Sequence, residues 1–93
     1  ALSIEDISYS VDEVDGEPQL RVSANVANTG SAVKPAPKLD VTVLDADDKV
    51  LNETTLSPEN LATEIAAEAS ETYFWKLPFP PENLDRVEVD FAK

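Results

Sequence analysis

The chain has 93 residues, with 19 acidic and 7 basic side chains and a formal net charge of −12, and it contains neither cysteine nor histidine. This length accommodates one hydrophobic core, so we expect a single domain over residues 1–93. The missing residue types exclude disulfides, thiol catalysis and the common zinc sites, and the negative field disfavours nucleic acid as a partner. Only two glycines are present to build a phosphate-binding loop. We therefore expect a protein that is not an enzyme and uses no cofactor.

The first two predicted elements are strands in which apolar and polar side chains alternate. In "ISYSV" the apolar residues are Ile7, Tyr9 and Val11, and the Asp15-Gly16 turn leads to the next strand. Alternation of this kind is typical of a strand with one buried face and one solvated face. The second strand, "QLRVSANVAN", has one apolar face made of Leu20, Val22, Ala24 and Val26.

A proline-containing loop and a predicted hairpin follow. Asn28 ends the second strand, and we expect its side chain to bond loop backbone, as asparagine often does at turns. The strand "LDVTV" has Leu39, Val41 and Val43 on one face, and the strand "VLNETTL" comes after the sequence "DADD". Two such strands around a short polar tip predict a β-hairpin over residues 39–56.

The hairpin tip carries Asp45, Asp47 and Asp48, which allow two interpretations. In the first, these carboxylates, with Asp40 as a further candidate, bind Ca²⁺. Such a site takes six to eight oxygen ligands and commonly has a glycine turn and a bidentate glutamate, which this segment lacks. In the second, the tip is a turn in which Asp48 adopts the left-handed conformation and Lys49 partly offsets the charge. We favour the turn and keep a weak calcium site as a hypothesis.

The segment "SPENLATEIAAEAS" departs from the strand pattern. Ser57 is a suitable N-cap, Pro58 suits the first helical position, and Leu61 and Ile65 are four residues apart. These features predict a short helix or helical turn that crosses between two sheets.

Two strands complete the chain. In "RVEVDFAK" the apolar residues Val87, Val89 and Phe91 alternate with charged ones, after a turn at "PFPPEN". The strand before that turn, "ETYFWKL", has Tyr73, Trp75 and Leu77 on one face, with Phe74 on the other. The whole pattern predicts an all-β fold, a six- or seven-stranded antiparallel immunoglobulin-like sandwich with one short helical crossover.

The strand "TYFWKL" is the candidate binding site. If Tyr73 and Trp75 fill the core, Phe74 points outward beside charged residues, and exposed aromatic residues of this kind are frequent interface anchors. The alternative is that Phe74 packs beneath the 57–69 crossover. We therefore take Phe74, with Tyr73 and Trp75 beside it, as the candidate binding residues.

One long segment, "LRVSANVANTGSAVKPAPKLDVTVLDADDKVLNETTLSPENLA", resembles an uncharacterised bacterial domain that is usually found C-terminal to a zinc ribbon and one transmembrane helix. The matching features are an apolar strand ending in Asn28, a Pro-x-Leu sequence ending at Leu39, an Asp45 turn and a Pro-x-x-Leu sequence ending at Leu61. The segment also looks like the FxLYD domain, whose signature falls on residues 41–45. The resemblance implies a sandwich on the extracytoplasmic side of a membrane, periplasmic or at the cell surface, and no known activity.

Three functions from different classes remain open. The leading expectation is a non-enzymatic, extracytoplasmic protein-interaction module that contacts a partner protein or a second copy of itself, and that meets a membrane only through a segment outside this chain. The first alternative is a structural spacer domain without a specific partner, for which the acidic surface provides solubility. The second is a weak calcium-binding β-sandwich that uses the three tip aspartates.

Overall fold

Eight β-strands and no helix make up the computed structural model, which describes residues 1–93. The strands are β1 (Leu2–Val14), β2 (Glu17–Asn28), β3 (Lys34–Pro35), β4 (Leu39–Leu44), β5 (Val50–Leu56), β6 (Glu64–Ile65), β7 (Ser70–Pro78) and β8 (Arg86–Phe91). The all-β prediction is confirmed. The predicted count of six or seven strands is wrong, because six long strands are joined by two further strands of two residues each. No helix of the structure is long and apolar enough to cross a membrane.

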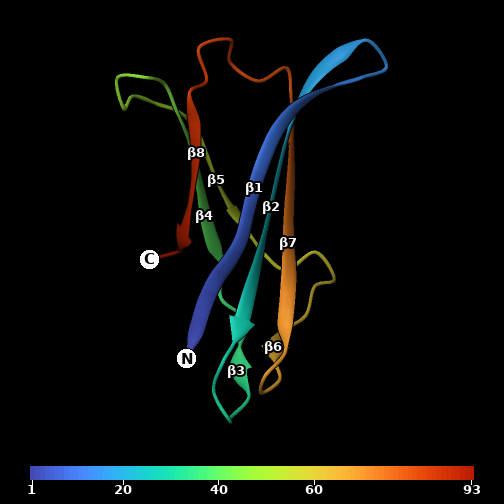
Figure 1. Cartoon of the computed structure of the whole chain (residues 1–93), viewed down its shortest axis with the longest axis vertical. Coiled ribbons are helices and arrows are strands. Elements are labelled where there is room, and N and C mark those ends of the chain that lie inside the picture. The colour runs from blue at the N-terminus through green and yellow to red at the C-terminus, as the bar shows by residue number, and fades with distance from the viewer.

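The long strands form two antiparallel three-stranded sheets, with the orders β1-β2-β7 and β5-β4-β8, and the short strands β3 and β6 pair with each other. The two larger sheets face one another, with β1 across from β8 and β5 across from β7 (Figure 1). Both sheets contribute to one core of 11 buried residues: Leu20, Val22, Ala24, Val26, Leu39, Val41, Val43, Ile65, Tyr73, Val87 and Val89.

This core confirms the period-two pattern read in β2, β4 and β8. Every second residue of these strands points into the space between the sheets, where its side chain is shielded from water. Burial of each such valine or leucine stabilises the folded state by roughly 1.5–3 kcal/mol. The exception is Phe91, which continues the inward pattern of β8 but remains exposed at the end of the strand. The predicted hairpin is confirmed as β4 and β5, which pair antiparallel.

The predicted helix at residues 57–69 is wrong. The backbone instead forms a turn in which the N–H of Leu61 donates to the carbonyl of Pro58 (2.9 Å), and Leu61 has a left-handed φ of 60°. The Asn60 side chain accepts from the N–H of Ala62 at 3.0 Å. Only one of the two apolar residues of the expected stripe, Ile65, reaches the core, while Leu61 is exposed. A short helix without a buried face is marginal, so pairing of β6 with β3 replaces it.

A β-bulge divides the first strand. The pairing of β1 with β2 shifts by one residue between Glu5 and Ser8, and Asp6 has a left-handed φ of 54°. Before the bulge the even-numbered Ile4 pairs with an inward residue of β2, and after it the odd-numbered Tyr9 does so. The extra residue therefore keeps the apolar side of both halves of β1 toward the opposite sheet.

The side chain of Asn28 bonds the backbone of the loop that follows β2, as expected from its position, and joins that loop to β6. Its amide nitrogen donates to the carbonyls of Ala32 (2.8 Å) and Ile65 (3.0 Å), and its oxygen accepts from the N–H of Gly30 (3.1 Å). A Cβ at position 30 would lie only 2.9 Å from the backbone nitrogen of Ala1. Gly30 is therefore needed for close approach of two backbone segments.

Candidate functional site

The three tip aspartates lie in the turn between β4 and β5. The side chain of the first, Asp45, accepts hydrogen bonds from backbone N–H groups of the turn. One carboxylate oxygen of Asp45 accepts from the N–H groups of Asp47 and Lys49, each at 2.9 Å. Asp48 has a left-handed φ of 64°, as the turn interpretation predicted. No group of three or more acidic side chains in the structure is arranged to hold a metal ion. The geometry is that of a hydrogen-bonded turn, and weak calcium binding stays a hypothesis.

The cation that meets Asp48 is Arg86 at the start of β8, and not the neighbouring Lys49. The guanidinium lies 2.6 Å from the carboxylate of Asp48 and 3.1 Å from that of Glu88. The hydrogen bond to Asp48, and to a smaller extent that to Glu88, raises the pKa of Arg86 above its ordinary value. The pair joins the hairpin tip to β8 but lies at the surface, where water screens it, so it contributes little to stability.

Two of the three candidate binding residues on β7 face the core. Tyr73 is completely buried, and its hydroxyl donates to the carbonyl of Pro37 at 2.6 Å. Trp75 is half-buried and packs against the core from the same face of the strand. The structure thus places Tyr73 and Trp75 on the inward face that the alternation predicts, so that of the three candidate residues only Phe74 faces outward.

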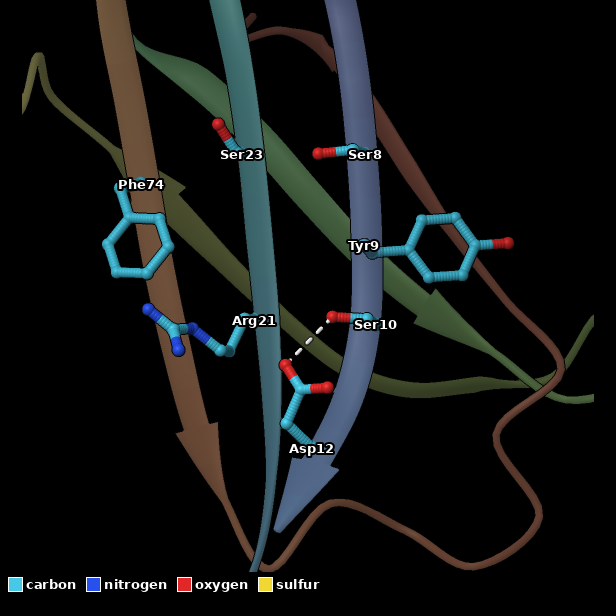
Figure 2. Close-up of a pocket in the computed structure, with 7 residues that line it drawn as sticks. All are labelled: Ser8, Tyr9, Ser10, Asp12, Arg21, Ser23 and Phe74. Carbon is cyan, nitrogen blue, oxygen red and sulfur yellow. Dashed lines mark hydrogen bonds between the residues drawn. The ribbon is translucent and has the colours of Figure 1, made fainter. Parts of the chain in front are cut away.

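Phe74 has the opposite orientation and lies on the outer face of the β1-β2-β7 sheet, as the alternation predicted. It pairs across the sheet with Ser23, and no residue of the 57–69 segment lines the hollow that its ring borders. The ring borders an open hollow on this face (Figure 2). The residues around the hollow are Ser8, Tyr9, Ser10, Asp12, Arg21, Ser23 and Phe74.

Two cations flank the Phe74 ring. The guanidinium carbon of Arg21 lies 5.5 Å from the ring centroid, and the ammonium nitrogen of Lys76 lies 5.6 Å from it. Arg21 on β2 pairs with Lys76 on β7, two residues along from the Ser23–Phe74 pair and therefore on the same face of the sheet. Each cation–π contact at an exposed position is worth about 0.5–1 kcal/mol.

These two cations carry no ion pair, since every salt bridge of the structure involves Arg86. The nearby carboxylate of Asp12 accepts a hydrogen bond from Ser10 at 3.0 Å (Figure 2). The outer face therefore presents an aromatic ring, two cations and the hydroxyls of Ser8 and Ser23 on a molecule that is otherwise strongly acidic. This combination suits a ligand group that is both apolar and anionic.

The sequence located Phe74 on the outer face but did not find its partners. Arg21 is recognisable as an outward residue of β2, yet nothing in one strand shows which residue of a distant strand lies beside it. The register of β2 on β7 joins Arg21 to Lys76, and this pairing connects segments far apart in the chain.

Comparison with known proteins gives one match. A family model described as "Protein of unknown function (DUF3426)" matches residues 2–89, a region that includes the Phe74 surface and every strand except the last two residues of β8. No curated protein and no solved structure was found to match. The expectation of an uncharacterised domain is confirmed, and the family description names no activity.

Proposed function

Because the chain belongs to the family described as protein of unknown function (DUF3426), which supplies no activity, we propose from the geometry that it is a non-enzymatic protein-interaction module. The observation that carries this proposal is Phe74, an aromatic ring on an outer sheet face between two cations that have no carboxylate partner. Aromatic and arginine side chains are enriched among the residues that dominate binding energy at interfaces.

The proposed partner is a protein segment with acidic and apolar side chains. Its carboxylates would approach Arg21 and Lys76 while an apolar side chain covers the ring of Phe74. A second copy of this chain also has many carboxylates, but bringing together two molecules with a net charge of −12 each is opposed by their mutual repulsion. A separate partner is therefore favoured over self-association.

The proposal includes an immunoglobulin-like arrangement and an extracytoplasmic location. The chain passes from one sheet to the other between β2 and β4, returns between β5 and β7, and crosses again between β7 and β8, as expected of a sandwich with Greek-key connections. The location, and a membrane anchor outside this chain, rest on the sequence resemblance to a domain that follows a zinc ribbon and a transmembrane helix. Fractionation of cells that produce the full-length protein tests this part.

The binding proposal is tested by capture with matched baits. The wild-type chain, Phe74→Ser and Phe79→Ser are immobilised and incubated with envelope extract of the source organism. Phe79 is a suitable control because it is an exposed phenylalanine without a flanking cation. We expect a protein that binds the wild type and Phe79→Ser but is reduced at least tenfold on Phe74→Ser.

Thermal unfolding separates a lost contact from a lost fold. Since Phe74 lies outside the core, we expect Phe74→Ser to lower the melting temperature by only about 4–8 °C, the shift that corresponds to roughly 1 kcal/mol for a domain of this size. A much larger loss would show that Phe74 holds the fold together. Equal capture by all three baits would contradict the proposal, and capture by none would favour the structural spacer.

A further inference from the structure

Each of the two large sheets ends in two edge strands, and β1 and β8 are the edges on one side of the molecule, here called the open side, while β5 and β7 are the edges on the other. In its own sheet β1 pairs only with β2, and β8 pairs only with β4, so each has one free edge. Because β1 lies across from β8, the two free edges occur on the same side of the molecule. The strands run in opposite directions, so the second half of β1 and the beginning of β8 lie toward the same end (Figure 1).

Apolar side chains of β1 face the open side without cover. Tyr9 pairs with Val22 and Val11 pairs with Leu20, and paired residues of an antiparallel sheet point to the same face. Their partners on β2 are 1% and 0% exposed, yet Tyr9 is 42% exposed and Val11 is 51% exposed. In Figure 2 Tyr9 leaves β1 on the side opposite to Ser8 and Ser10. Both residues face inward, but no strand of the opposite sheet covers them.

The free edge of β8 supplies unpaired backbone groups. The N–H of Ala92 donates to the carbonyl of Lys38 across the β4–β8 pair at 2.9 Å. Successive residues of an antiparallel strand direct these groups alternately to opposite edges. The N–H and C=O groups of Val87, Val89 and Phe91 therefore point away from β4, toward the open side. Such an edge is a template for one more strand.

The charged residues of β1 and β8 indicate which kind of segment would bind at the open side. Along β1 the ionisable residues before Tyr9 are Glu5 and Asp6, those after Val11 are Asp12 and Glu13, and β1 has no cation. On β8 the carboxylates outnumber the single cation, Arg86, which is held by Asp48. Carboxylates thus predominate on both strands along the open side, which favours basic residues in a bound segment and opposes a second copy of the chain.

We propose that the open side binds an extended segment of a partner protein in which apolar and basic residues alternate. The segment pairs with the free edge of β8 as an additional strand. Its apolar side chains cover Tyr9 and Val11, and its basic side chains are attracted by the excess of carboxylates on β1 and β8. The Phe74 surface lies on the outer face of the β1-β2-β7 sheet, where Ser8 and Ser10 point, whereas the side chain of Tyr9 points to the opposite side of β1 (Figure 2). The two sites therefore use different side chains and are tested by different substitutions.

The test uses a capped peptide of alternating valine and lysine, about eight residues long, which matches the length of a typical strand. Binding to the isotopically labelled chain is followed by NMR, with hydrogen exchange of the backbone amides as the readout. We expect saturable binding, and slower exchange of the amides of Val87, Val89 and Phe91. A peptide of alternating valine and glutamate is expected to bind at least tenfold more weakly.

Two lysine substitutions form a matched pair. Val11 and Val50 are each 51% exposed, but Val50 is on β5, at the opposite side of the sandwich. We expect Val11→Lys to weaken peptide binding at least tenfold, whereas Val50→Lys and Phe74→Ser change it less than twofold. Neither valine belongs to the buried core, so both variants retain the fold.

Several results would overturn the proposal. They are absence of binding at millimolar peptide, equal binding of the acidic peptide, or equal effects of the two lysine substitutions. Loss of binding with Phe74→Ser alone would assign the peptide to the other surface. Dimerisation of the chain without peptide, abolished by Val11→Lys in sedimentation experiments, would identify a second copy as the occupant instead.

Discussion

The buried tyrosine of β7 shows how one hydroxyl connects packing to pH. Burial, with a smaller contribution from the charge of Glu71, raises the pKa of Tyr73 above its ordinary value of 10.0. The neutral phenol is the form that donates to the carbonyl of Pro37. The unfolded chain therefore releases this proton at a lower pH than the folded chain, and the stability that Tyr73 contributes is complete below the unfolded pKa and is lost as pH rises through the folded pKa.

From this we predict that the free energy of unfolding decreases above about pH 10, and that Tyr73→Phe removes part of that decrease. At neutral pH the same variant is expected to be less stable by roughly 1 kcal/mol, because it leaves the carbonyl of Pro37 without its donor. Urea unfolding between about pH 7 and pH 11 measures both effects.

Tyr9→Phe is the matched control, since Tyr9 is exposed and its hydroxyl makes no hydrogen bond in the structure. If the two variants have the same pH dependence, the hydroxyl of Tyr73 has no special role in the loss of stability at high pH.

At the scale of elements, the bulge in β1 resolves a conflict in the sequence. The apolar residues are Leu2 and Ile4, then Ile7, Tyr9 and Val11, so the spacing changes from two to three at one place. Without an extra residue there, one half of the strand would turn its apolar face to solvent, because the side-chain period of a strand is two. The shift in pairing between Glu5 and Ser8 matches this place.

We predict that deletion of Asp6 is tolerated, because it makes β1 a regular strand whose apolar residues remain on one face. The deletion removes a left-handed residue and the 3.2 Å hydrogen bond from Asn25 to Asp6. We expect cooperative unfolding, with a melting temperature within about 8 °C of the wild type, a shift of roughly 1 kcal/mol.

Deletion of Ala24 in the middle of β2 is the comparison. It reverses the faces of the residues on one side of the deletion and exposes part of the core, so we expect loss of the cooperative transition. If the Asp6 deletion unfolds the chain just as completely, the bulge is required for folding and is not only a correction of register.

Elements with clear alternation could be predicted from the sequence, and the connection at residues 57–69 could not. Strands β2, β4 and β8 can be predicted from their own sequences, because every second residue in them is apolar. In the connection, the spacing of Leu61 and Ile65 indicated a helix. Whether both side chains can be buried depends on which parts of the fold lie beside this segment, and one segment of sequence does not show that. The outward position of Phe74 followed from period two, whereas its pairing with cations depended on strand register.

At the scale of the whole molecule, the net charge of −12 extends over dimensions of 43 × 30 × 17 Å. The screening length is about 30 Å at 0.01 M salt and about 3 Å at 1 M. At low salt the acidic groups therefore repel one another across the entire fold, and only Arg86 forms ion pairs that offset this repulsion.

We predict that added sodium chloride raises the melting temperature by several degrees between about 0.01 M and 1 M, because compact states with high net charge are destabilised by self-repulsion. Differential scanning calorimetry measures the change. Sucrose, which is uncharged, distinguishes screening from general exclusion of solute.

Calcium and magnesium chloride at equal ionic strength separate screening from specific binding. We expect equal shifts from both salts. A rise specific to calcium, lost in Asp47→Asn, would instead support the calcium hypothesis for the tip aspartates.

The position of β2 between β1 and β7 also has a consequence for the order of events in folding. Strand β1 joins β2 through a short local hairpin, whereas β7 must return from far along the chain, so that Gln19 meets Pro78 and Ala27 meets Ser70. Closure of such long loops makes all-β domains of this size fold in milliseconds to seconds. The ring of Phe74 meets Arg21 only after that closure, so the binding surface is acquired late and an incompletely folded chain does not display it.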